Sequence, residues 1–303
     1  MKVNWQGVFP AVSTQFHSDQ SLDLNASQQM LDRLITEGVH GIIVCGTVGE
    51  NCSLSAPEKR QVLAAAKEAV NGRVPLISGV AETTTALAAS YAKDAEQLGI
   101  DGLMVLPGMV YRSQPHEAIH HLLQVAKSTA LPVMVYNNPV SYSVDISLES
   151  MAVLAEQPNI VAVKESTEDT RRISELYNRF GDRFTVFSGV DDIALESLML
   201  GATGWISGLT NVFPQESVAI YNLAKQGRYA EALAIWRWFL PLLRLDTIPT
   251  LVQCIKLAEQ LAGRGSETVR APRLPLSGIE RQRVETLFAE AMATRPDLRK
   301  FTQ

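Results

Sequence analysis

The sequence predicts an α/β fold: a (β/α)8 TIM barrel followed by a C-terminal helical extension. Eight short runs of apolar and β-branched residues recur along the chain, and the segments between them have helical periodicity. The starts of the runs lie about 20–35 residues apart, the length of one strand and one crossover helix. The runs are residues 7–16, 41–47, 74–81, 102–108, 132–139, 160–166, 184–191 and 204–211.

Runs that are apolar nearly throughout favour parallel strands, because helices cover both faces of a parallel sheet. Eight strand–helix units favour a closed barrel. The alternative is a doubly wound open sheet, but no run is followed by a glycine-rich dinucleotide-binding fingerprint. We therefore expect the barrel.

The helical segments carry end signals. In the helix expected after the second run, Ser55 is a candidate N-cap, Pro57 lies in the first turn, and Glu58 completes a capping box. Gly38 and Gly99 end two other segments as glycine C-caps. These signals place helices between the strands, as a barrel requires.

The strand pattern stops after residue 211. Residues 214–246 and 247–263 have helical patterns, and the first is long enough for the last barrel helix and an additional one. We therefore divide the chain into a catalytic barrel, residues 1–225, and a helical extension packed on it, residues 226–303. The extension has an apolar face that the barrel or another subunit must cover. This face includes Trp236, Trp238, Phe239 and Leu240.

Composition narrows the possible partners. The chain of 303 residues has a formal net charge of −5, with both signs scattered and no basic run, so nucleic acid and anionic membranes are not expected partners. No run approaches the ~18 apolar residues of a spanning helix, and the N-terminal segment lacks the apolar stretch of a signal peptide. Three cysteines without CxxC spacing fit a reducing, cytoplasmic setting.

The sequence gives no sign of a metal or an organic cofactor. The five histidines form neither an HxH nor an HExxH pattern, so we expect no metal site. No nicotinamide, flavin or P-loop fingerprint is present, so we expect no cofactor. The expected partner is a small molecule.

Lys164 stands at the end of the sixth run, "IVAVKES", after four apolar residues. Active sites of (β/α)8 barrels lie at this end of the strands. The lysine could pair with a carboxylate or extend to the rim. Alternatively, an apolar site would lower its pKa, and the neutral amine could attack a carbonyl and form a Schiff base. Such an imine withdraws electrons and permits C–C or C–O cleavage.

Other polar residues close neighbouring strands. Tyr136 ends the fifth run, where it could be a core tyrosine or could relay the protons of Schiff-base chemistry. Thr47 ends the second run, within the glycine-bracketed turn "GTVGEN" that begins at Gly46. Backbone N–H groups of such a turn could hold a carboxylate, to which Thr47 could add a hydroxyl, or the turn could be only a tight connection. Ser188 and Ser207 close the last two runs.

Three motifs in this order, "GTVGE", "YNNP" and "VKES", resemble those of the dihydrodipicolinate synthase / N-acetylneuraminate lyase family of class I aldolase-like enzymes. The resemblance covers residues 7–300. It implies a homotetramer, a dimer of dimers, in which Lys164 forms a Schiff base with a 2-oxo acid or related imine and Tyr136 relays protons. It also implies that Thr47 and Val48 bind the substrate carboxylate and that the backbone of Ile206 faces the keto acid.

The chain departs from the synthase pattern at several positions. Synthases read GTTGE, and we take their second threonine as a proton relay towards a neighbouring subunit, which Val48 would interrupt. They carry an arginine for the second substrate's carboxylate where this chain has Ser141. They also have a Tyr-Tyr pair where this chain has Gly108 and Met109. Whether Tyr111 or Tyr142 enters the site stays open. Sialic acid lyases have a Ser-Thr pair in the glycine turn.

Further stretches, among them "YNNPVSYSVDIS" and "LDTIPTLVQCIKLAEQ", resemble family members identified as Δ1-pyrroline-4-hydroxy-2-carboxylate deaminases of hydroxyproline catabolism. The resemblance implies that Lys164 attacks the ring imine and opens the ring by transimination. Loss of a C3 proton then gives an enamine that expels the 4-hydroxyl as water, and hydrolysis releases 2-oxoglutarate semialdehyde and ammonia. The alternatives are an aldolase that releases pyruvate, a dihydrodipicolinate synthase, and a non-catalytic metabolite sensor.

Overall fold

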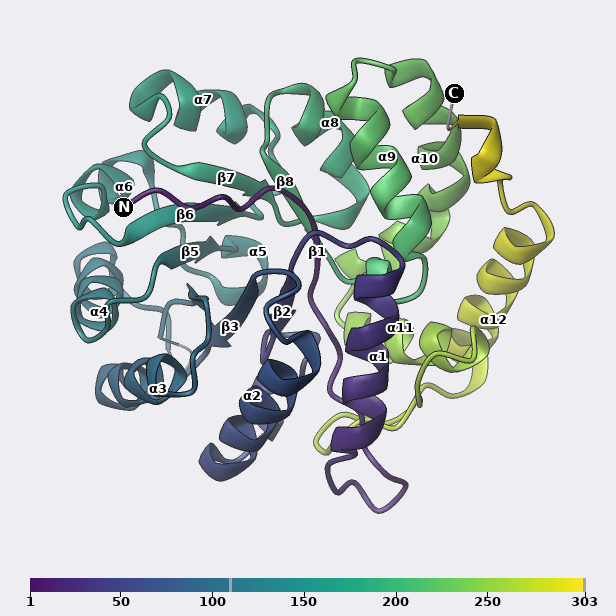
Figure 1. Ribbon diagram of the computed structural model, residues 1–303, viewed down its shortest axis with the longest axis horizontal. Coiled ribbons are helices and arrows are strands. Elements are labelled where there is room, and N and C mark those ends of the chain that lie inside the picture. Colours follow the sequence, from purple (N-terminus) through teal and green to yellow (C-terminus); the bar gives the residue numbers. More distant parts are fainter. Residues whose placement is uncertain (109–110, 302–303) are drawn as a thin grey trace.

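The computed structural model describes residues 1–108 and 111–301 and contains one eight-stranded parallel sheet (Figure 1). Its strands pair in the order β1-β8-β7-β6-β5-β4-β3-β2. The chain after β1 closes the ring against β2, because Ala11 bridges Ile43 and the Val12 N–H donates to the Ile43 carbonyl at 2.8 Å. The strands are β1 (Gly7–Pro10), β2 (Ile42–Val44), β3 (Leu76–Val80), β4 (Gly102–Val105), β5 (Val133–Asn137), β6 (Ile160–Glu165), β7 (Thr185–Ser188) and β8 (Gly204–Ser207).

The predicted (β/α)8 barrel is confirmed, and the open-sheet alternative is wrong. Each predicted run contains one strand, but the runs are longer than the strands because apolar residues continue into the rim loops. Helices follow the strands around the barrel, with α10, α11 and α12 to one side (Figure 1). The helices are α1 (Leu24–Thr36), α2 (Ala56–Val70), α3 (Thr85–Gln97), α4 (Pro115–Lys127), α5 (Pro139–Tyr142), α6 (Leu148–Leu154), α7 (Arg171–Phe180), α8 (Ala194–Met199), α9 (Pro214–Lys225), α10 (Tyr229–Leu243), α11 (Leu251–Leu261) and α12 (Gly278–Ala293).

The helix ends follow the sequence signals. Ser55 and Glu58 form the predicted capping box at the start of α2, where the Ser55 N–H donates to Glu58 Oε2 at 2.8 Å. Gly38 and Gly99 follow α1 and α3 with φ of +94° and +74°, backbone angles that glycine adopts without steric cost. None of the described helices is long and apolar enough to cross a membrane.

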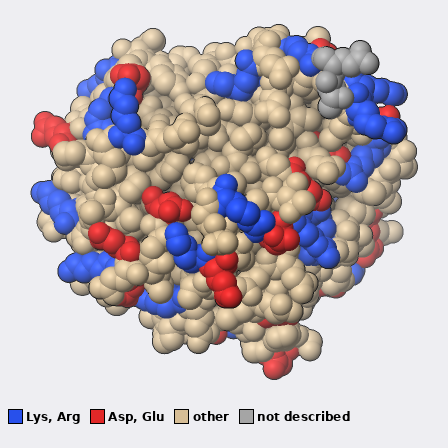
Figure 2. Space-filling view, in the orientation of Figure 1, with Lys and Arg blue, Asp and Glu red and all other residues tan. Residues whose placement is uncertain are grey.

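The C-terminal extension packs on the barrel of its own chain. Trp236 of α10 meets Trp205 of β8 edge-on, with ring centroids 6.0 Å apart. Phe213, which precedes α9, packs edge-on against Trp238 and Phe239, with ring centroids 5.3 Å and 5.5 Å apart. The barrel and extension thus share one aromatic core, and the division at residues 225/226 stays a prediction. On the face shown in Figure 2, positive and negative side chains are interspersed.

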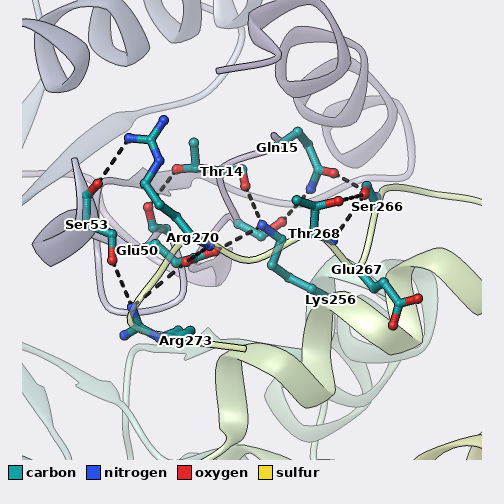
Figure 3. Close-up of polar contacts among 12 residues, drawn as sticks. Thr14, Gln15, Glu50, Ser53, Lys256, Ser266, Glu267, Thr268, Arg270 and Arg273 are labelled. Carbon is teal, nitrogen blue, oxygen red and sulfur yellow. Dashed lines mark hydrogen bonds and ion pairs between the residues drawn. The ribbon is translucent and has the colours of Figure 1, made fainter. Parts of the chain in front are cut away.

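A buried ion pair joins the extension to the turn after β2 (Figure 3). Lys256 of α11 donates to Glu50 Oε1 at 3.0 Å and to the Thr14 carbonyl at 2.8 Å, and both charged side chains are 0% exposed. The Arg270 N–H donates to Glu50 Oε2 at 3.0 Å, and Arg273 lies 3.9 Å from the same oxygen. The carboxylate is therefore held from two parts of the extension.

Glu50 itself shapes the glycine turn. Its backbone has φ of +54°, and its N–H donates to the Thr47 carbonyl at 3.0 Å. The turn is further fixed by Thr14, whose hydroxyl donates to the Gly49 carbonyl at 2.6 Å, and by Asn51, whose amide donates to the Cys45 carbonyl at 2.9 Å. Residues 46–51 therefore form a turn whose geometry depends on the extension.

Replacing Lys256 by Met should lower the free energy of unfolding by about 3–5 kcal/mol, because the buried Glu50 carboxylate would lose its nearest cationic partner. The double variant Glu50→Gln/Lys256→Met should regain much of this loss, because neither buried charge remains. Urea unfolding at one protein concentration measures both. Lys2→Met is the matched control, because Lys2 pairs with Asp182 at the surface and the two side chains are 92% and 95% exposed. Its unfolding midpoint should equal that of the wild-type protein. Equal losses in the single and double variants would contradict the assignment.

Candidate active site

A cavity of about 420 Å³ opens at the carboxyl ends of the barrel strands. Its wall is assembled from segments far apart in the sequence, including the turn after β2, strands β5, β6 and β8, and the 3-10 helix η4 (Arg244–Thr247) of the extension. Among its lining residues are Gly46, Thr47, Val48, Tyr136, Ser141, Tyr142, Lys164, Ser166, Gly189, Ile206, Gly208 and Asp246.

Lys164 and Tyr136 are paired across the middle of this wall. They are register partners on the adjacent strands β6 and β5, so their side chains leave the sheet side by side. Lys164 Nζ lies 4.0 Å from the centroid of the Tyr136 ring, and the residues are 6% and 5% exposed. Two positions 28 residues apart in sequence thus meet at one point of the cavity.

Burial shifts the pKa of both groups away from their ordinary values, and in opposite directions. Burial lowers the pKa of Lys164, although electrostatic interactions with Asp246, Tyr142 and Asp191 oppose this shift. Burial raises the pKa of Tyr136 to about 12, opposed by a hydrogen bond from the Asn138 amide at 3.1 Å. The site therefore favours a neutral amine beside a protonated phenol.

A second phenol lies against Tyr136. Tyr142 of α5 meets Tyr136 edge-on with ring centroids 5.7 Å apart, and its hydroxyl forms a short hydrogen bond with Thr47 Oγ1. The sequence interpretation took Val48 as the break in a proton relay, but Thr47 reaches a phenol within its own chain. The hydroxyl groups of Thr47, Tyr142 and Tyr136 thus lie along one wall.

The structure also decides which tyrosine enters the site. Tyr142 lines the cavity, whereas Tyr111 is 60% exposed and lies outside its lining. Gly108 also lies outside the lining, and Met109 falls outside the described residues.

The predicted substrate-binding residues are not all on the wall. Gly46, Val48, Ile206 and Ser141 line the cavity. Ser207 does not line it: the residue is 0% exposed, and its Oγ accepts a hydrogen bond from the Thr210 N–H at 3.0 Å. The part assigned to Ser207 in substrate binding therefore has no support from its side-chain position.

Sequence reasoning missed Ser166, Gly189 and Asp246. Ser166 lies two residues after Lys164 and therefore on the same face of the chain, and its buried hydroxyl lines the cavity without a protein hydrogen-bond partner. Gly189 leaves room for the lysine, because a Cβ there would lie 2.7 Å from Lys164 Cε. Strand parity could have indicated Ser166, but Asp246 comes from a separate helix and carried no signal.

Within residues 1–108 and 111–301, no group of three or more His, Cys, Asp or Glu side chains is placed to hold a metal ion. The described wall offers an amine, two phenols, the carboxylates of Asp246 and Glu168, small hydroxyl groups and backbone N–H groups.

Comparisons with known proteins place this site in a family. Residues 4–291 match the model of the dihydrodipicolinate synthetase family. The 4-hydroxy-tetrahydrodipicolinate synthase of Methanosphaerula palustris is 33% identical over 293 residues, which cover 96% of this chain and 99% of the relative. The synthase of Sorangium cellulosum is 35% identical over 290 residues, 94% of each chain.

Solved structures agree with these matches. The 4-hydroxy-tetrahydrodipicolinate synthase of Methylacidiphilum fumariolicum SolV superposes with a TM-score of 0.94 at 29% identity, covering 98% of this chain and 99% of the other. A prophage protein of the same family from E. coli K12, solved in complex with pyruvate, gives a TM-score of 0.90 at 29% identity, covering 96% and 99%.

Fold, site and relatives together define a class I Schiff-base lyase built on a (β/α)8 barrel. The chain belongs to the dihydrodipicolinate synthetase family.

Replacing Gly189 by Ala should slow the imine formation expected at Lys164 by at least about tenfold, because the new methyl group would displace the lysine from its attack geometry. Mass spectrometry of the borohydride-reduced pyruvate adduct, sampled over time, measures the rate. The new Cβ would also lie 2.1 Å from Ser166 Oγ. The double variant Ser166→Ala/Gly189→Ala removes that second clash and should stay slow. A double variant as fast as the Ser166→Ala variant would contradict displacement of Lys164.

Proposed function

We propose that Lys164 is the nucleophile that forms an imine with the 2-oxo carbon of a small carboxylic acid. The observation that carries this proposal is the buried pairing of Lys164 with Tyr136, with Nζ 4.0 Å from the ring centroid. A lysine with a lowered pKa supplies the neutral amine, and the adjacent phenol can transfer the protons. A metabolite sensor would not need this pair.

The steps follow from these groups. The amine attacks the carbonyl carbon and gives a carbinolamine, whose hydroxyl takes up a proton and leaves as water. The product is a protonated imine, and loss of a proton from the neighbouring carbon gives an enamine. We assign the proton transfers at the carbinolamine to Tyr136, assisted by the hydroxyl groups of Thr47 and Tyr142. Hydrolysis of the final imine releases the product and the free lysine.

We assign the substrate carboxylate to the turn after β2. The Thr47 hydroxyl and the backbone N–H groups of Thr47 and Val48 supply donors, and Gly46 lets the turn approach the ligand. The backbone of Ile206 closes the opposite side. Ser141, at the cavity rim, is the remaining polar candidate for contacts beyond the carboxylate.

The first candidate reaction is that of a 4-hydroxy-tetrahydrodipicolinate synthase, because the curated relatives described above carry this name. The comparisons thus favour the synthase over the deaminase suggested by the branch resemblance. The second candidate is that deaminase. Its support is that no arginine occurs among the described residues lining the cavity, where a second substrate's carboxylate would need one. A pyruvate-releasing aldolase is a further alternative.

Three assays on the purified protein separate the candidates. A synthase should form 4-hydroxy-tetrahydrodipicolinate from pyruvate and aspartate semialdehyde. A deaminase should release ammonia from Δ1-pyrroline-4-hydroxy-2-carboxylate without pyruvate. Pyruvate release from sugar-derived 2-oxo acids would indicate the aldolase. Each outcome supports one reaction and excludes the others as the main activity.

We further propose a cytoplasmic homotetramer, a dimer of dimers. The cysteines are free, with Cys45 and Cys254 buried, which fits a reducing compartment. One similar solved structure is described as a monomeric dihydrodipicolinate synthase variant, so the assembly has to be measured. Light scattering coupled to size exclusion should give four times the chain mass.

Replacing Lys164 by Arg should reduce turnover to background and abolish the pyruvate adduct, because a guanidinium does not lose its proton and cannot attack a carbonyl. Mass spectrometry after borohydride reduction should show one adduct per wild-type chain, on the peptide that contains Lys164. Lys59→Arg is the matched control, since Lys59 is also buried but pairs with Glu82 away from the cavity. An adduct on another lysine would overturn the assignment.

The rate of pyruvate adduct formation should rise with pH and reach its plateau below pH 10.5, the value of an ordinary lysine. The sign follows from burial: a lowered pKa means that the neutral amine predominates at a lower pH. Electrostatic interactions with Asp246, Tyr142 and Asp191 oppose this shift. Asp246→Asn removes one of them, so its profile should move to lower pH. A wild-type rate still rising at pH 10.5 would contradict the lowered pKa.

A further inference from the structure

We propose that Asp246 determines substrate specificity, and that the substrate carries a hydroxyl or an ammonium group, not a second carboxylate, at the end facing Asp246. This inference rests on the proposed imine at Lys164 and extends it to a second charged side chain of the same cavity. Asp246 belongs to the extension, outside the eight strand ends that normally supply a barrel's catalytic groups.

The first observation is the position of the Asp246 side chain. It projects from η4 into the cavity and lies against Gly208, just after β8. A Cβ at position 208 would be 2.6 Å from Asp246 Oδ1. The glycine therefore provides the space that the carboxylate occupies, close to Ile206 at the end of β8.

The second observation is the charge of the wall. Among the described lining residues, Lys164 is the one cation, whereas Asp246 and Glu168 are acidic. When Lys164 is bound to the substrate as an imine, no other cationic side chain of the described wall remains for an anion. A second carboxylate would meet like charge without a partner, whereas a hydroxyl or ammonium would donate a hydrogen bond to Asp246.

The third observation is that the neighbouring acids are engaged elsewhere. Asp191 is 0% exposed, and its carboxylate accepts hydrogen bonds from Trp205 Nε1 and the Leu209 N–H, each at 2.9 Å. Asp192 is paired with Arg244 at 3.8 Å and does not line the cavity. Of Asp191, Asp192 and Asp246, only Asp246 lines the cavity.

The ionisation state of Asp246 is compatible with its proposed role as a hydrogen-bond acceptor for the substrate. Burial raises its pKa to about 6, while the Lys164 charge opposes the shift. The carboxylate is therefore largely charged at neutral pH and can accept a hydrogen bond from a neutral or a cationic donor. Ser166, with its unpartnered buried hydroxyl, adds a further small polar group to the same wall.

The test uses pyruvate and three longer 2-oxo acids. All four form an imine at C2, and the three longer acids differ in the group on C4. Pyruvate has no C4, 4-hydroxy-2-oxobutanoate carries a hydroxyl, 2-oxopentanoate a methyl group, and 2-oxoglutarate a carboxylate. Attack of Lys164 on C2 releases water, and borohydride then delivers hydride to the imine carbon to fix the adduct. The trapped fraction is measured by mass over a concentration series. Pyruvate adduct left by cleavage of the hydroxy acid is counted with the intact adduct.

The wild-type protein should trap the hydroxy acid at least about tenfold better than the methyl analogue, and 2-oxoglutarate least well. In Asp246→Asn, the preference of 2-oxopentanoate over 2-oxoglutarate should fall at least about tenfold, because the repelling charge is gone. Ratios within one variant cancel any general change in Lys164 reactivity. Asp192→Asn, the matched control, should keep the wild-type ratios.

The outcomes separate the two proposals. If the wild-type protein gives no adduct with pyruvate, the proposed imine at Lys164 fails. If pyruvate is trapped but the wild-type protein takes 2-oxoglutarate as well as the hydroxy acid, the inference about Asp246 is overturned and the imine stands. The same holds if Asp246→Asn keeps the wild-type ratios. The wild-type selectivity alone decides the inference if the variant does not fold.

Discussion

The buried ion pair between Glu50 and Lys256 is the interaction on which the shape of the cavity depends. An ion pair without solvent contact adds little net stability compared with apolar packing, but losing one partner is costly. The pair therefore acts as a geometric constraint that fixes the turn after β2 relative to α11. The same extension delivers Asp246 to the opposite wall. Two sides of the cavity are thus set by residues beyond the barrel, which makes the extension part of the site.

Burial has a double effect at the centre of the cavity. The low-dielectric surroundings disfavour the charged form of every group, so the pKa of Lys164 falls while that of Tyr136 rises. A nucleophile needs the first shift and a proton donor needs the second. One physical cause thus gives both residues the pKa shifts that their proposed roles require, and register pairing of β5 and β6 brings them together. Gly189 keeps the space that the lysine needs.

The sequence predicted the barrel well, because strand periodicity, helix caps and spacing are local signals that agree with one another. It also pointed to Lys164, Tyr136 and Thr47, since polar residues at the ends of apolar strands stand out and barrel strand ends converge. The structure brings the three residues together on one cavity, and their catalytic roles stay predictions. It could not place Tyr142, which reaches Thr47 only through the fold of α5. Ser207 was predicted to bind substrate because it ends a strand. Its hydroxyl instead accepts a hydrogen bond from the Thr210 N–H inside the protein.

Asp246 illustrates why substrate specificity is harder to derive than chemistry. The imine requires a lysine in an apolar strand end, a feature that a short motif can encode. The part of the wall that contains Asp246 is built from loops and an added helix, where no periodicity limits the choice of side chain. In the proposal made above, an acid there sets the preferred ligand while the lysine keeps its chemistry, since specificity is a difference between two binding free energies. Relatives that share the lysine can therefore differ in substrate through one residue of the extension.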